Sequence, residues 1–152
     1  TELGISTRFF DERQNLNFEV ASNGEQIRTS GNGFARDWNL NPTLTHRFSD
    51  RLKVTGRLYT THYSTESFLN SERDGSRYYS DSFEQSFTRP EAVAEYYVTP
   101  DQVITAGGGY IFERVATTRY GDQGNREQGT AYGFFQHEWA PNSKWSVIAG
   151  GR

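Results

Sequence analysis

The sequence contains no cysteine, no methionine, only four prolines and no long apolar run in its 152 residues. The lack of cysteine excludes disulfide frameworks, thiolate metal sites and cysteine nucleophiles. A transmembrane helix is also excluded, because it needs about 20 consecutive apolar residues. The formal net charge of −3 argues against a general nucleic-acid binder, since neutralising phosphates requires a basic surface.

Aromatic residues, in contrast, make up 15% of the chain, with 9 Tyr, 11 Phe and 3 Trp. Disordered chains are poor in aromatic residues, so this composition indicates a folded protein. The length corresponds to a single domain.

Alternation with a period of two residues is the dominant pattern, and helical periodicity is hard to find. It is clearest over residues 34–48, which are too many for a typical soluble strand of about 5–6 residues. Apolar side chains there share one face of the expected strand, namely Phe34, Trp38, Leu40, Leu44 and Phe48. After a turn at 49–51 the alternation resumes, which predicts a hairpin.

The same unit recurs along the chain. Residues 87–98 and 102–118 form a second expected hairpin, residues 130–139 and 145–152 form another, and residues 3–10 and 16–21 form a weaker one around a turn at 11–14. The sequence therefore predicts an all-β fold, an antiparallel up-and-down meander of about eight strands.

Short turns alternate with long polar stretches at 22–33, 64–82 and 119–129. Outer-membrane β-barrels have short turns on one side, long loops on the other, and aromatic girdles at both interfaces. The pattern thus favours part of a transmembrane β-barrel in a bacterial outer membrane. Two alternatives remain: a soluble or surface β-sheet module that binds through its long loops, and a small outer-membrane barrel whose eight strands close.

The C-terminal strands carry a more specific signature. Residues 131–139 (AYGFFQHEW) and 144–152 (KWSVIAGGR) resemble a strand–turn–strand hallmark of TonB-dependent outer-membrane transporters. Residues 46–55 are similar to a periplasmic turn of that family, and residues 103–110 to one of its barrel strands.

The resemblance implies a barrel of about 22 strands around a plug domain. It also implies import of a siderophore–iron complex, haem, cobalamin or a glycan with energy from TonB. The implied partners are membrane lipid and lipopolysaccharide, the rest of the barrel, the plug and TonB, with no nucleic acid. Residues 1–152 are then one incomplete barrel domain without a plug. Counting eight strands places both ends of the chain on the long-loop side, which predicts an internal segment.

Side-chain parity in the last hairpin points Gln136, Glu138 and Arg152 into the barrel. These residues are expected to form a polar cluster, which either contacts the plug or fixes neighbouring strands to one another. Ligand contact is expected in the loops instead. Two cations and two aromatic rings, Arg73, Arg77, Tyr78 and Tyr79, suit an anionic, ring-bearing ligand. An ordinary solvated loop is the alternative.

No residue pattern indicates catalysis, so the protein is not expected to be an enzyme. The three histidines, His46, His62 and His137, lie on separate expected strands without ligand spacing, so neither a metal nor a cofactor is expected. Three consecutive glycines at 107–109 fall inside an expected strand. They predict a bulge or the close approach of another backbone.

Overall fold

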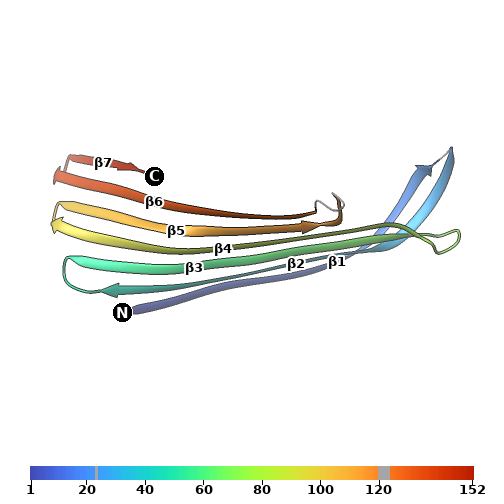
Figure 1. The fold of residues 1–152 in the computed structure, drawn as a ribbon, viewed down its shortest axis with the longest axis horizontal. Coiled ribbons are helices and arrows are strands. Elements are labelled where there is room, and N and C mark those ends of the chain that lie inside the picture. Colours follow the sequence, from blue (N-terminus) through green and yellow to red (C-terminus); the bar gives the residue numbers. More distant parts are fainter. Residues whose placement is uncertain (23, 120–123) are drawn as a thin grey trace.

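The computed structural model describes residues 1–22, 24–119 and 124–152, and it is a single antiparallel sheet (Figure 1). Its strands follow one another in chain order, so the sheet is a meander. They are β1 (Glu2–Ser22), β2 (Glu25–Arg47), β3 (Leu52–Ser71), β4 (Arg77–Thr99), β5 (Gln102–Thr117), β6 (Asn125–Asn142) and β7 (Trp145–Gly151). The predicted all-β meander is confirmed.

The described part of the chain forms seven strands, not eight, because the first expected hairpin is wrong. β1 runs without a turn through residues 11–14, where Asp11 is paired with Arg36 and Glu12 with Ala35 of β2. An ion pair between Asp11 and Arg36, with an oxygen–nitrogen distance of 3.1 Å, joins the strands at this point. The segment is polar on both faces, so the sequence shows no alternation there.

The long polar stretches are also mostly strand. β2 begins at Glu25, β3 continues to Ser71, and β4 begins at Arg77. The prediction of long loops at 22–33 and 64–82 is therefore wrong. A polar sequence can form regularly paired β-strands where both faces of a sheet meet water. In the third stretch, 119–129, β6 begins at Asn125, and residues 120–123 lie outside the described residues.

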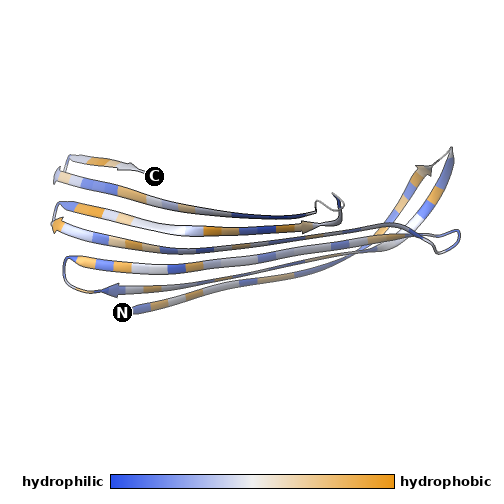
Figure 2. Ribbon diagram, viewed as in Figure 1, coloured by the Kyte–Doolittle hydropathy of each residue, from blue (hydrophilic) through white to orange (hydrophobic). Residues whose placement is uncertain are grey.

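The register gives the sheet two chemically different faces. Figure 2 shows hydrophilic and hydrophobic residues following one another along the strands. What we call the apolar face carries Leu3, Trp38, Leu40, Leu44, Leu58, Ala92, Tyr110, Phe135 and Trp139. The opposite, polar face carries Arg8, Asp37, Lys53, Arg57, Arg89, Glu91, Glu95, Tyr132, Gln136 and Glu138. Directly paired residues share a face, so the alternation of each strand adds to that of its neighbours.

The apolar face has the height of a membrane. From Trp38 in β2 to Phe48, the residue after that strand, about ten residue steps of roughly 3.3 Å, tilted by about 40°, span about 25 Å, the height of the lipid-facing band of a barrel. Beyond Trp38 the same face becomes polar, with His62 and Arg114 at the level of Trp38 or farther out. β2 has 23 residues, and a membrane crossing needs about 9–11. The strands therefore continue well past the band.

The apolar side chains are not packed into a core. Leu69, 9% exposed, is the only buried hydrophobic residue in the ranges that the structure describes. Trp38 is 38% exposed and Leu44 is 51% exposed. A soluble β module would bury these side chains, so the observation counts against that alternative. No helix in the described ranges is long and apolar enough to cross a membrane.

The sheet does not close. β1 and β7 lie at its two edges, and each pairs with one neighbour only. The eight-stranded closed barrel is therefore wrong for this chain. The N-terminus lies at the end of the sheet that carries the turn at 48–51, which we call the short-turn end (Figure 1). The expectation that both termini lie at the opposite, far end is wrong for the N-terminus. Residues 2–22 form one strand and not the expected hairpin, so the chain crosses the sheet once fewer and begins at the short-turn end.

Two prolines interrupt the hydrogen-bond ladder in the middle of the apolar band. Pro42 in β2 faces β3 at a gap in their pairing, and Pro90 in β4 faces β5 at another. Proline has no N–H to donate, so each gap lies on the side where that donor is missing. Each proline follows a residue of the polar face, Asn41 or Arg89, whose side chain contains a buried atom without a hydrogen-bond partner.

Candidate functional site

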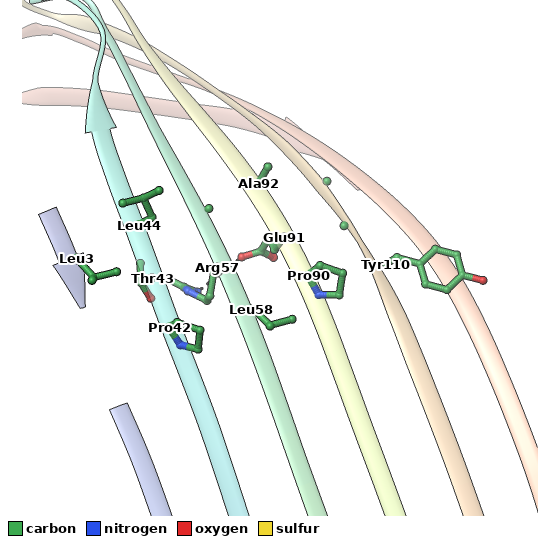
Figure 3. Close-up of a pocket in the computed structure, with 13 residues that line it drawn as sticks. Leu3, Pro42, Thr43, Leu44, Arg57, Leu58, Pro90, Glu91, Ala92 and Tyr110 are labelled. Carbon is green, nitrogen blue, oxygen red and sulfur yellow. Dashed lines mark ion pairs between the residues drawn. The ribbon is translucent and has the colours of Figure 1, made fainter. Parts of the chain in front are cut away.

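A chain of contacts crosses the polar face from β3 to the end of β7. Arg57 lies opposite Glu91, with 3.6 Å between Nη1 and Oε1. The Tyr132 hydroxyl donates a hydrogen bond of 2.6 Å to Oε2 of the same Glu91. The Arg152 guanidinium carbon lies 4.7 Å from the centre of the Tyr132 ring. Figure 3 shows Arg57 and Glu91 pointing toward one another, with Tyr110 directed away from them.

Glycine makes this connection possible, because Tyr132 on β6 reaches across β5 to Glu91 on β4. The residue beneath it is Gly109, which is paired with Tyr132 in the register. A Cβ at Gly109 would lie 2.8 Å from the Tyr132 hydroxyl oxygen and 2.4 Å from the Pro90 carbonyl oxygen. Gly107 similarly lies under the Phe134 ring. The predicted close approach of backbone is confirmed, and the register passes through 107–109 without a bulge.

Glu91 is the only carboxylate in this chain of contacts, and its side chain is 15% exposed. Replacing Glu91 with glutamine is expected to destabilise the protein by about 2 kcal/mol, because two partners lose a charge-assisted bond. Glu19→Gln is the matched control, since both side chains of its ion pair with Arg28 are more than half exposed to water and exposed pairs contribute about 0–1 kcal/mol. Chemical unfolding in lipid vesicles measures both. Equal losses would show that the Glu91 contacts add no stability.

Other ion pairs hold neighbouring strands together on the same face. The Lys53 ammonium contacts both oxygens of Glu95, at 2.9 and 3.0 Å, and Tyr97 donates to Glu95 as well. Farther along, Asp37 accepts from Arg8 and from Thr61. Each of these bonds joins adjacent strands or neighbours on one strand. The polar face is therefore charged, and many of its side chains are bonded to one another at the height of the apolar band.

The predicted cluster of Gln136, Glu138 and Arg152 is brought to this face, but not into one group. The Gln136 amide donates to Glu138 at 2.6 Å. Arg152 instead stacks on Tyr132, whose hydroxyl is bonded to Glu91. Sequence analysis missed Arg57, Glu91 and Tyr132. Tyr132 is an even number of residues from Gln136 and so shares its face, and its strand follows the glycine run at 107–109. These two features together could have identified Tyr132 from the sequence.

A second cluster lies on the polar face beyond the band. Asp81, 6% exposed, accepts hydrogen bonds from Nε and Nη2 of Arg119 at 2.9 and 2.7 Å. The Thr118 hydroxyl donates to the other carboxylate oxygen at 3.3 Å. A cavity of about 410 Å³ opens beside this pair, and its polar lining includes Glu12, Gln14 and Tyr63. The cavity is chemically suited to a polar ligand.

Acid is expected to weaken this cluster. The Arg119 hydrogen bonds hold the pKa of Asp81 below its ordinary value of 3.8. Folding therefore gains stability from Asp81 above that ordinary value and loses it as the pH falls through the lowered pKa. We expect Asp81→Asn to cost about 1–2 kcal/mol at neutral pH and to flatten the fall of the unfolding midpoint in strong acid. Asp50→Asn, at an exposed turn, is the control. An unchanged pH profile in Asp81→Asn would contradict the assignment.

The residues predicted to contact ligand in the loop do not converge. Arg73 pairs with Glu25 of β2, with 3.2 Å between Nη1 and Oε2. The guanidinium of Arg77 lies 4.4 Å from the centre of the Phe68 ring. Tyr78 and Tyr79 are 40% and 45% exposed at the beginning of β4. Arg73 and Arg77 are thus held by contacts within the sheet, while the two rings are accessible to solvent.

The apolar face also contains a shallow groove. Its volume is about 610 Å³, and small residues form its floor, including Gly56, Ala92 and Gly108. Leu44, Leu58 and Tyr110 surround it. Within the described ranges, no three histidine, aspartate or glutamate side chains form a group that could hold a metal ion.

No protein-family model and no curated protein matches the sequence. Solved structures do match. The ferripyoverdine receptor of the outer membrane of Pseudomonas aeruginosa, bound to ferripyoverdine, aligns with a TM-score of 0.54 and 14% identity, over 97% of this chain and 23% of that one. P. aeruginosa FpvA bound to heterologous pyoverdines aligns with a TM-score of 0.56 and 13% identity, over 97% and 24%.

A third structure, the FpvAI–pyocin S2 complex, aligns with a TM-score of 0.53 and 14% identity, over 97% of this chain and 24% of that one. The chain thus spans about a quarter of the length of the receptors it matches. These neighbours are TonB-dependent receptors, so the likeness expected from residues 131–139 and 144–152 is confirmed at the level of the fold. The chain has the fold of a section of the barrel of an outer-membrane receptor.

Proposed function

We propose that this chain is part of the barrel wall of a TonB-dependent receptor in a bacterial outer membrane, and that the receptor imports a scarce nutrient. The two-faced sheet carries this proposal. Its apolar face matches the thickness of a membrane, and its polar face carries ion pairs at the same height. In a closed barrel the apolar face meets lipid and the polar face meets the interior.

The unpaired edges of β1 and β7 fit the same proposal. An open edge in hydrocarbon leaves backbone N–H and C=O groups without partners, so further strands must pair with both edges. Residues 1–152 are then one section of a larger barrel. The plug, TonB, membrane lipid and lipopolysaccharide are its proposed partners.

A ferric siderophore is the substrate class that we propose. Two of the matched structures described above were solved with ferripyoverdine or heterologous pyoverdines. The extended strands beyond the apolar band build the cavity beside Asp81 and Arg119, where a polar ligand could first be captured. Exposed Tyr78 and Tyr79 add rings near the same end. Haem, cobalamin and glycans are the other substrate classes of the proposed family. The proposed role is transport and not catalysis.

The test compares wild-type cells with cells that lack the gene for the full-length protein. In wild-type cells we expect the protein in the outer-membrane fraction, from which detergent extracts it. We also expect the deletion to reduce uptake of iron supplied as a ferric siderophore, with a similar loss in cells that lack TonB. Re-expression is the control. Recovery of the protein from the soluble fraction would refute the barrel, and normal uptake of every ferric siderophore supplied would refute the substrate class.

A further inference from the structure

Four aromatic rings gather on the polar face, from the middle of the apolar band outward. Tyr59 and Phe87 pack edge to face across β3 and β4, with 5.9 Å between their ring centres. Tyr63 and Phe83 form a second such pair at 6.2 Å, farther along the same two strands. The register places all four side chains on the polar face. We call these four rings the aromatic strip.

Contact with lipid does not account for the aromatic strip. Rings of an interfacial girdle point outward into the bilayer, whereas these four lie on the face opposite to the apolar one. The outward positions of the same stretch are polar, namely His62, Ser64, Glu84 and Ser86. Tyr63 is nevertheless 38% exposed, and the other three rings are half-buried. Exposed rings on a face that is otherwise charged indicate a binding surface.

The aromatic strip joins two polar features of the sheet. At its outer end, Tyr63 lines the cavity of about 410 Å³ beside Asp81 and Arg119. At its inner end, the guanidinium carbon of Arg89 lies 5.9 Å from the centre of the Tyr59 ring. The strip is roughly 20 Å long, about six residue steps of 3.3 Å along β4. It therefore leads from the cavity to a cation inside the membrane-spanning part of the sheet.

The arginine at the inner end provides a second, independent observation. Nε of Arg89 is buried and has no hydrogen-bond partner in the described chain. Glu91, two residues along β4, is bonded to Arg57 and Tyr132 instead. A buried donor without a partner is destabilising. An acceptor that engages the Arg89 guanidinium would therefore be bound favourably at the end of the strip.

We propose that the aromatic strip and Arg89 form a binding surface for a flat, ring-bearing anion, as part of the transported ligand. The inference rests on the proposed function in one respect, that this face lines the barrel interior. A ring of the ligand packs against Tyr63 and Phe83. An anionic group of the same ligand accepts hydrogen bonds from the forked guanidinium of Arg89. Because the ring pairs follow one another along the strands, the surface extends inward from the cavity.

The test uses the full-length protein purified in detergent, with salicylate as the probe, because salicylate joins one aromatic ring to one carboxylate. Cyclohexanecarboxylate carries the charge without an aromatic ring, and phenol carries the ring without the charge. Saturation-transfer NMR at neutral pH measures the affinity for each compound, and the signal from micelles without protein is subtracted.

The variants separate the rings from the charge. Tyr63→Leu and Phe83→Leu remove a ring and keep apolar bulk, whereas Arg89→Gln removes the cation. Phe68→Leu is the matched control for the rings, since Phe68 belongs to a ring pair with a centre distance of 6.3 Å on the other face. Arg114→Gln is the control for the charge, because Arg114 also lies on the other face.

We expect the wild type to bind salicylate about fivefold more tightly than either comparison compound, the ratio that one ring contact or one cation contact supplies. The two ring variants should lose the preference for salicylate over cyclohexanecarboxylate. Arg89→Gln should lose the preference over phenol. Both control variants should keep both preferences.

The proposal is overturned if the wild type does not prefer salicylate, or if the controls lose the preference as the test variants do. Rings that only hold the sheet together, or that pack against another part of the polypeptide, would lower the unfolding midpoint when replaced, without any preference for salicylate. Fractionation and iron uptake separate this result from failure of the proposed function. An outer-membrane protein that supports ferric-siderophore uptake but shows no such preference would refute the binding surface alone.

Discussion

Leu44→Arg is expected to destabilise the protein in a bilayer by about 2–4 kcal/mol, the cost of a cation on the lipid face near the membrane midplane. Leu44 lies near the middle of the apolar band and is 51% exposed, so the arginine would face hydrocarbon and not a protein partner. Chemical unfolding of the full-length protein in lipid vesicles measures this cost.

The adjacent residue provides the control. Thr45 is on the polar face of the same strand, where its hydroxyl lies 3.1 Å from that of Thr55. Thr45→Arg places the same side chain one residue away on the opposite face, and we expect a loss of about 1 kcal/mol or less, since water reaches the barrel interior. Comparable losses for the two variants would mean that the two faces meet similar surroundings, and the membrane-spanning assignment would be wrong.

The same difference between faces explains which parts of the fold could be predicted from sequence. Residues 38–47 and 52–58 alternate because lipid requires apolar groups on one face and water or protein accepts polar groups on the other. Parity alone therefore predicted that Gln136, Glu138 and Arg152 share one face, and in the structure that face is the polar one.

Beyond the apolar band this requirement ends. Residues 11–14 and 25–33 are strand, yet nothing in their composition distinguishes them from loop. Cross-strand pairs such as Asp11 with Arg36 become visible only once the register is known. The strand count was wrong for this reason, although the meander was right.

The chain of contacts around Glu91 could not be predicted for a different reason. Tyr132 and Glu91 are 41 residues apart and belong to strands that are not neighbours. Their bond depends on a register that places Gly109, and not a larger residue, beneath the tyrosine ring. The glycine run was visible in the sequence, but the side chains that it accommodates depend on how two other strands align with it.

Gly109→Ala is accordingly expected to cost about 3 kcal/mol, at the upper end of ordinary overpacking. The new Cβ would lie 2.4 Å from the Pro90 carbonyl oxygen, and backbone cannot move aside as a side chain can. Gly56→Ala is the matched control, since Gly56 lies in β3 and a Cβ added there would have nothing within 4 Å. We expect Gly56→Ala to be neutral or slightly stabilising, because alanine restricts the unfolded chain more than glycine does.

Tyr132→Ala separates the two obstacles at Gly109. Removing the ring leaves the Pro90 oxygen in place, so Gly109→Ala should remain costly in the Tyr132→Ala background if the backbone conflict dominates. If the conflict with the tyrosine hydroxyl dominates, most of the cost of Gly109→Ala should vanish in the Tyr132→Ala background, because that substitution has already removed the hydroxyl and its bond to Glu91. A double-mutant cycle measures the difference as a coupling energy. A cost for Gly109→Ala equal to that for Gly56→Ala in both backgrounds would mean that β5 has room for a side chain, and that glycine is not what lets Tyr132 reach Glu91.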